Sequence, residues 1–274
     1  ATCIMTYDMD GVLRVHQPNV VRRIDMHPHQ TLWDWIEDAQ RTMQAQVHPM
    51  SPNAHTQFRT GFVGYWGYEL KDESLGLAPL SSKRYEPYSG TGFDRTKLPA
   101  AQWAFCDHAL CLDHATNTWM AYALVDDGGD TCGPLAELET HGVRLGMPAA
   151  EAEAWLTQAQ RAVDSLHRMA DVPPASLKVH TVDDAGVYKD RIEACRRYIA
   201  SGESYELCLT TQFEGALPFS PSYASYFSLY CALRQKNPAP FSAYMELVSS
   251  DGSTPQAILS TSPERFLTVS DAGA

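Results

Sequence analysis

Residues 198–213 read YIASGESYELCLTTQF, and this stretch predicts a helix end, a turn and a strand in direct succession. Gly202 follows the last apolar residue of the helical pattern, where a helix C-terminus favours the left-handed backbone that glycine adopts easily. From Tyr205 to Phe213 apolar and polar residues alternate, which is the period of a half-buried β-strand. The stretch therefore indicates a mixed α and β fold.

The downstream sequence continues this mixture. Ser220-Pro221 supplies an N-cap and a first-turn proline for another helix. Three short apolar runs then predict strands, at Phe241–Val248, Ala257–Ser260 and Arg265–Val269.

The upstream sequence contains strands joined by tight turns. Asp10-Gly11 favours a hairpin between two short strands, and Thr31 suits the N-cap of a helix. Because strand pairs joined by short turns run antiparallel, we predict an α+β fold with largely antiparallel sheets and flanking helices. The other predicted elements are strands within Phe58–Leu70, Trp103–Leu112 and Trp119–Val125, and a helix over Trp155–Met169.

A proline-rich segment divides the chain. Residues 171–184 read DVPPASLKVHTVDD, with two adjacent prolines and few large apolar residues, a composition typical of linkers. We therefore predict an N-terminal domain over residues 1–170 and a second domain over residues 185–274.

Composition excludes several classes of partner. The 274 residues carry 21 Lys and Arg against 33 Asp and Glu, a net charge of −12, whereas nucleic-acid binding needs a basic surface. No stretch approaches the roughly 18 apolar residues of a membrane span, and no secretory leader is visible. Seven cysteines without a C-x-x-C pair indicate free thiols in a reducing compartment. We expect a cytoplasmic protein, or a plastid protein in a plant, with no nucleic-acid or membrane partner.

One cluster has the composition of a zinc site: Cys106, His108, Cys111 and His114 lie within nine positions. The segment has the pattern of a strand, in which neighbouring side chains alternate between faces. Cys106 and His108 would then face one way and Cys111 the other, so the four groups would not converge on one metal ion. We predict no metal site here.

The glycines Gly61, Gly64 and Gly67 do not have the spacing of a phosphate-binding loop. Large aromatic residues separate them, which favours close packing of the backbone within a strand instead. The hydrolase elbow, the zinc-protease helix and the nucleotide-binding P-loop are also absent from the sequence.

Two glutamates interrupt apolar strand patterns. Glu206 lies on the polar face of the predicted strand over 205–213, and Glu264 lies between two apolar runs. A carboxyl among apolar neighbours has a raised pKa, as a general acid requires. The alternative for each is a solvated or ion-paired glutamate at a sheet edge, with Arg265 as the neighbouring cation of Glu264.

Four sequence blocks together resemble the chorismate-utilising enzymes, which include the large subunits of anthranilate synthase and aminodeoxychorismate synthase. Their order and approximate spacing agree with the family, and the likeness covers most of the chain. The blocks are FVGYWGYEL at 62–70, YIASGESYELCLTTQF at 198–213, NPAPFSAYM at 237–245 and STSPERFL at 260–267.

The resemblance implies a two-domain α+β fold like that of anthranilate synthase component I. It makes Glu264 the catalytic acid that protonates the leaving C4 hydroxyl of chorismate. It places Glu206 on the active-site wall, at a position where water-using members have an activating lysine, and this favours ammonia as the nucleophile. Pro240 and Phe241 match the border of an amino-acid pocket that binds tryptophan in the family. Ser242, which follows them, matches the aminodeoxychorismate synthase branch, and the stretch GESYELCLTT at 202–211 most resembles the fungal and plant form of that branch.

The resemblance also implies features that fall outside these residues. The family's P-I-K-G-T segment, whose lysine adds to C2 of the substrate, would follow Glu264, as would the helices with the Mg²⁺ ligands. The chain therefore resembles an interior fragment of such an enzyme, and we expect it to be inactive by itself. Ammonia would come from a glutamine amidotransferase domain or subunit.

Three functions follow from these observations. The first is aminodeoxychorismate synthase, which forms 4-amino-4-deoxychorismate from chorismate and ammonia for p-aminobenzoate and folate. The second is the anthranilate synthase large subunit, which serves tryptophan synthesis. The third is a non-catalytic module that binds an amino acid.

Overall fold

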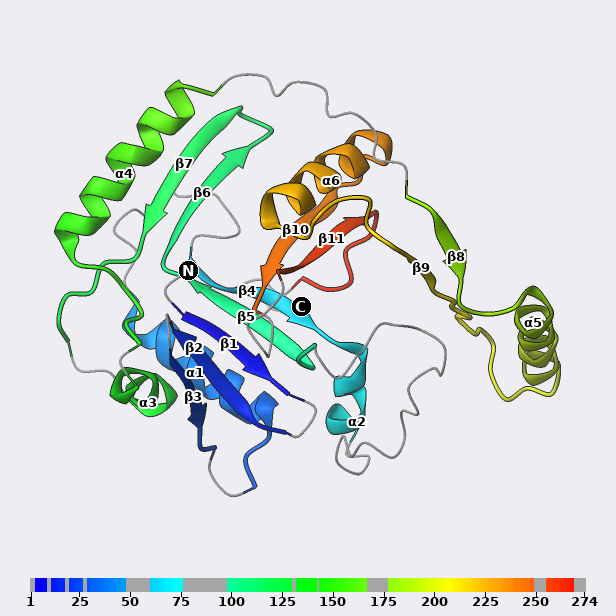
Figure 1. The fold of residues 1–274 in the computed structure, drawn as a ribbon. Coiled ribbons are helices and arrows are strands. Elements are labelled where there is room, and N and C mark those ends of the chain that lie inside the picture. The colour runs from blue at the N-terminus through cyan, green and yellow to red at the C-terminus, as the bar shows by residue number, and fades with distance from the viewer. Residues whose placement is uncertain are drawn as a thin grey trace. The chain divides into compact units, whose positions relative to one another are not determined.

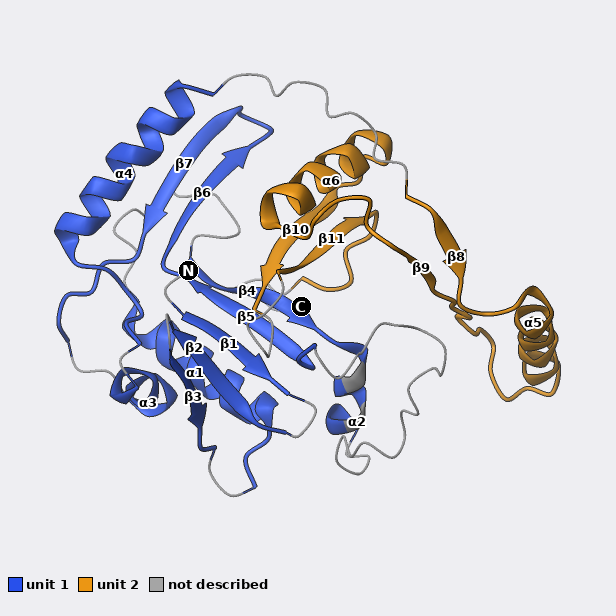
Figure 2. Ribbon diagram, viewed as in Figure 1, with its two compact units in different colours: residues 1–85, 98–170 blue, residues 86–97, 171–274 orange. Residues whose placement is uncertain are grey.

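The computed structural model has an α+β fold with antiparallel sheets and flanking helices (Figure 1). It describes residues 3–8, 11–17, 20–26, 29–47, 60–75, 98–129, 132–141, 143–166, 177–248 and 255–268. The chain divides into two compact units (Figure 2). Unit 1 comprises residues 1–85 and 98–170, and unit 2 comprises residues 86–97 and 171–274.

Unit 1 is built on a five-stranded sheet in the order β3-β2-β1-β5-β4, with every neighbouring pair antiparallel. Gly11 has a φ of 76°, as the predicted hairpin before β2 requires, while Asp10 lies outside the described residues. The strands are β1 (Cys3–Tyr7), β2 (Leu13–Gln17), β3 (Val20–Ile24), β4 (Gly61–Trp66) and β5 (Ala101–Cys106).

One face of this sheet forms the core of unit 1, because alternate residues such as Cys3, Met5 and Tyr7 are buried there. Helix α1 (Leu32–Gln46) contributes its buried Trp35 to this core, and α3 (Gly133–Thr140) packs beside α1. Thr31 caps α1, as predicted: its side chain accepts from the backbone of Asp34, whose carboxylate accepts from the backbone of Thr31.

Gly64 confirms the predicted close packing of backbone in β4. A Cβ atom there would lie 2.0 Å from the carbonyl oxygen of Gln102 on β5, so only glycine fits. The chain after β4 forms the short helices η1 (Tyr68–Leu70) and α2 (Lys71–Ser74).

The prediction of one continuous strand over Trp103–Leu112 is wrong, because the structure has two strands there. The chain turns at Asp107, so that β5 ends at Cys106 and β6 (His108–Asp113) pairs with β7 (Thr118–Ala123) as a separate hairpin. Asn117 has a φ of 54° in the turn between them. Helix α4 (Ala149–Asp164) packs on β7 and begins earlier than predicted.

The first described element of unit 2 is β8 (Val179–Thr181), so part of the predicted linker is a strand, while residues 171–176 lie outside the description. Among the described strands β8 pairs only with β9 (Phe213–Gly215), and α5 (Ala185–Ala200) lies between them in sequence. Gly202 has the predicted left-handed conformation, with a φ of 77°.

The half-buried strand predicted over 205–213 is wrong for all but its last residue. Residues 205–212 form no strand, and Tyr205 is 93% exposed. Alternation encodes an amphipathic segment, but a strand also needs a neighbour for its backbone groups. Among the described residues, β8 supplies that neighbour only at Phe213–Gly215.

The rest of unit 2 is a helix packed on a hairpin. Helix α6 (Tyr223–Lys236) packs on β10 (Phe241–Leu247) and β11 (Gln256–Ser262). The predicted cap at Ser220 is displaced by two residues, because Ser222 and Ser225 bond each other reciprocally in a capping box.

The strand predicted at Arg265–Val269 is also wrong for the described residues 265–268, which form no strand after β11, and Phe266 is fully exposed. None of the described helices is long and apolar enough to cross a bilayer.

Candidate functional site

The predicted residues Phe241 and Glu264 lie at the same end of the β10–β11 hairpin. Phe241 is the first residue of β10 and pairs with Ser262, the last residue of β11. Glu264 follows two residues later. The hairpin thus brings the P-A-P-F and S-P-E-R blocks together, although they are more than twenty residues apart in the sequence.

Two side-chain hydrogen bonds fix this end of the hairpin. Asn237, the C-cap of α6, donates from Nδ2 to Oγ1 of Thr261 over 2.9 Å. The hydroxyl of Ser242 donates to the carbonyl oxygen of Ala239 over 2.8 Å, which closes the turn around the exposed Pro240. The turn that leads into β10 is therefore tied to both α6 and β11.

Aromatic packing supports the hairpin from the side of α6. The ring of Tyr244 contacts Phe227 edge-on, at 5.2 Å between centroids, and lies 5.7 Å from Tyr230. Its hydroxyl donates to the carbonyl oxygen of Tyr223 at 3.0 Å and to Glu246 at 3.2 Å. Burial, together with the adjacent Glu246 carboxylate, raises the pKa of Tyr244 to about 12.

Glu264 lies exposed on the segment that leaves β11. The hydroxyl of Ser262 donates to its backbone carbonyl oxygen over 3.3 Å. Among the described residues, none bonds or ion-pairs with its carboxylate. In the absence of a ligand Glu264 is therefore a solvated glutamate, and it is not ion-paired with Arg265.

Arg265 does not form the ion pair with Glu264 that its position in the sequence allows. Its guanidinium lies over the ring of Phe241, 5.1 Å from the centroid, and donates to Oγ1 of Thr268 over 3.1 Å. No local pattern in the sequence indicates this stacking, since the two residues are distant along the chain.

Glu206 is also exposed, and its backbone is held locally by the hydroxyl of Ser204, which donates to the Glu206 carbonyl oxygen and accepts from its amide. No described hydrogen bond or ion pair joins Glu206 to the residues around Glu264. Pro240, Phe241 and Glu264 therefore lie at the same end of the hairpin, whereas no described bond connects Glu206 with them.

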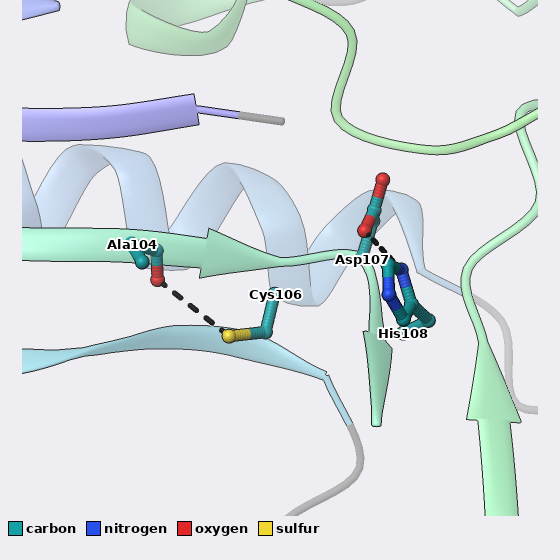
Figure 3. Close-up of polar contacts among 4 residues, drawn as sticks. All are labelled: Ala104, Cys106, Asp107 and His108. Carbon is teal, nitrogen blue, oxygen red and sulfur yellow. Dashed lines mark hydrogen bonds and ion pairs between the residues drawn. The ribbon is translucent and has the colours of Figure 1, made fainter. Parts of the chain in front are cut away.

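The candidate zinc cluster is arranged differently from the prediction. Figure 3 shows the thiol of Cys106 turned toward the carbonyl oxygen of Ala104, whereas the imidazole of His108 is turned toward Asp107. The distance from Nδ1 of His108 to Oδ1 of the buried Asp107 is 2.7 Å, and the ring also packs on Trp155. In the part of the chain that is described, no three His, Cys, Asp or Glu side chains gather as metal ligands would.

A family model described as chorismate binding enzyme matches residues 7–274. The chain belongs to this family. Aminodeoxychorismate synthase of Streptomyces griseus is 32% identical over 241 residues, which are 86% of this chain and 27% of that protein. The chloroplastic aminodeoxychorismate synthase of Arabidopsis thaliana is 28% identical over 211 residues, which are 77% of this chain and 20% of that protein. The chain thus spans about a quarter of the length of these relatives.

The fold is similar to that of a solved anthranilate synthase component I. Anthranilate synthase component I from Streptococcus pneumoniae TIGR4 superimposes with a TM-score of 0.58 over 98% of this chain and 50% of that protein, at 18% identity. The predicted fold class and family resemblance are both confirmed.

Proposed function

We propose that this chain is the part of an aminodeoxychorismate synthase that carries the acid Glu264. The observation that carries the proposal is the pairing of Phe241 with Ser262, which joins the P-A-P-F and S-P-E-R blocks at one end of the β10–β11 hairpin in a chorismate-binding chain. Relatives named aminodeoxychorismate synthase in bacteria and plants support this branch of the family.

In the proposed reaction Glu264 donates a proton to the C4 hydroxyl of chorismate, which leaves as water, and ammonia takes its place at C4. An acid of this kind must be neutral and desolvated at the moment of transfer. Glu264 is followed in sequence by the exposed apolar side chains Phe266 and Leu267. Chorismate or another part of the protein that covers this segment would exclude water from the carboxyl.

Glu206 has the lesser proposed role of lining the active-site wall. A carboxylate cannot supply the positive charge with which a lysine activates water, so Glu206 favours ammonia as the nucleophile. A glutamine amidotransferase domain or subunit is the proposed source of that ammonia, and tryptophan is the proposed ligand of the Pro240–Phe241 pocket.

Mg²⁺ is a further proposal, drawn from the family resemblance. The described residues gather no set of three ligands for it, and we assign no step of the reaction to it. Bound Mg²⁺ would neutralise substrate carboxylates, which matters for a chain of net charge −12.

The test is product analysis of the complete protein with chorismate, glutamine and Mg²⁺. We expect a product that an added aminodeoxychorismate lyase converts to p-aminobenzoate. Direct formation of anthranilate and pyruvate would replace the proposal with the anthranilate synthase alternative, the enzyme for which the solved structural relative is named. Saturable binding of tryptophan in calorimetry without any turnover of chorismate would favour the amino-acid-binding module.

A further inference from the structure

The segment that carries Glu264 lacks the backbone pairing that fixes the rest of the hairpin. Strand β11 ends at Ser262, and residues 263–268 form no strand. A general acid, however, must lie within about 2.6–3.2 Å of the atom that it protonates. Some other contact has to hold this segment in place.

Arg265 makes that contact. Its guanidinium lies 5.1 Å from the ring centroid of Phe241, within the range of a cation–π interaction. Its Nη1 also donates to Oγ1 of Thr268 at 3.1 Å. The Arg265 side chain thus contacts both the start of β10, at Phe241, and the far end of the segment, at Thr268.

Phe241 is a fixed anchor for this contact. It stands in register with Ser262, and the next pair, Ser242 with Thr261, is held by side-chain bonds to Ala239 and Asn237. The backbone that carries the ring is therefore held by strand pairing and by the side-chain bonds next to it.

We propose that Arg265 is a positioning residue for Glu264, and that it acts by stacking on Phe241 instead of pairing with the carboxylate. The inference rests on the proposed function, in which Glu264 is the acid. An ion pair with Arg265 would stabilise the ionised carboxylate, which cannot donate a proton. The stacking holds the segment and at the same time keeps the guanidinium away from Glu264.

The contact itself is tested in the 274-residue chain by the rate of chymotryptic cleavage after Phe266. Arg265→Ala and Phe241→Leu should each raise the cleavage rate about two- to fivefold, the change expected for one exposed cation–π contact. The double variant should be cleaved no faster than either single variant, and Arg265→Lys should recover part of the resistance. Arg196→Ala, which removes an exposed arginine of α5, is the control. Unchanged cleavage, or effects that add in the double variant, would overturn the proposal.

The consequence for Glu264 is tested in the complete protein by steady-state kinetics with chorismate. We expect Arg265→Ala to lower kcat about 10- to 100-fold with little change in KM, since it misplaces the acid without removing it. Phe241→Leu leaves the guanidinium able to reach Glu264, so the alkaline limb of its pH profile should move to lower pH, which Arg265→Ala should not do. An unshifted Phe241→Leu profile or a normal kcat for Arg265→Ala contradicts the positioning role. If the wild-type protein does not turn over chorismate, the proposed function fails, and the cleavage rates still decide whether Arg265 holds the segment.

Discussion

Thr211 donates a hydrogen bond from its hydroxyl to Oδ2 of Asp183 over 2.8 Å, and the same oxygen pairs with Nη1 of Arg191 at 2.7 Å. Asp183 precedes α5, Arg191 lies on α5, and Thr211 lies on the segment that returns from the helix. The side chain of Asp183 is only 8% exposed. One buried carboxylate therefore ties the helix to the segment that carries Glu206.

We expect Asp183→Ala to loosen that segment. A hydrogen bond to a charged group contributes about 1.5–3 kcal/mol, so limited chymotryptic cleavage within residues 205–212 should accelerate by roughly tenfold or more. Asp190→Ala, at an exposed position on α5, is the matched control and should leave the cleavage rate unchanged. Equal cleavage rates in the two variants would show that Asp183 does not hold the segment.

Gly64→Ala should destabilise unit 1 strongly. The new methyl group would lie 2.0 Å from the carbonyl oxygen of Gln102, so β4 and β5 would have to separate. Overpacking of this kind costs about 1–3 kcal/mol or more in the free energy of unfolding. Chemical denaturation measures the loss, and Gly129→Ala, whose Cβ would meet only the side chain of Asp127 at 3.3 Å, should be nearly neutral. A stable Gly64→Ala variant with an intact β4–β5 pair would contradict the packing.

Alkaline pH should destabilise unit 2 through Tyr244. Its pKa is raised from 10.0 to about 12 in the folded chain, so the folded state binds this proton more tightly than the unfolded state. The resulting stabilisation is complete below pH 10 and is lost as the pH rises toward 12. Tyr244→Phe keeps the ring contacts with Phe227 and Tyr230 but removes the titrating group. Denaturation between pH 9 and 12 should therefore show a flatter pH dependence for Tyr244→Phe than for wild type, with Tyr198→Phe as the exposed control.

Local signals in the sequence predicted the elements that local interactions stabilise. Thr31 and Asp34 cap α1 through bonds within four residues, and the φ of Gly202 follows from its place after a helix. The strand predictions over 205–212 and 265–268 were wrong for a different reason. Alternation indicates which side chains share a face, but it does not identify the neighbouring strand with which the backbone would pair. The sequence did not show that the S-P-E-R and P-A-P-F blocks are neighbours, which follows only from the β10–β11 register. That Arg265 contacts the ring of Phe241, and not the carboxylate of Glu264, also depends on this register.

Glu264→Gln in the complete protein should abolish the chemical step and spare substrate binding. The amide keeps the shape of the carboxyl but has no proton to donate, and loss of a general acid lowers kcat by roughly 10²-fold or more with little change in KM. Glu206→Gln, an equally conservative change at an exposed glutamate that no described bond connects with Glu264, should be much milder. If Glu264 were only a solvated surface residue, its replacement would cost a few tenths of a kcal/mol in stability and nothing in rate. Steady-state turnover of chorismate with glutamine separates the two cases. A near-normal kcat in Glu264→Gln would show that this residue is not the acid, and the family membership would then be without an assigned catalytic group.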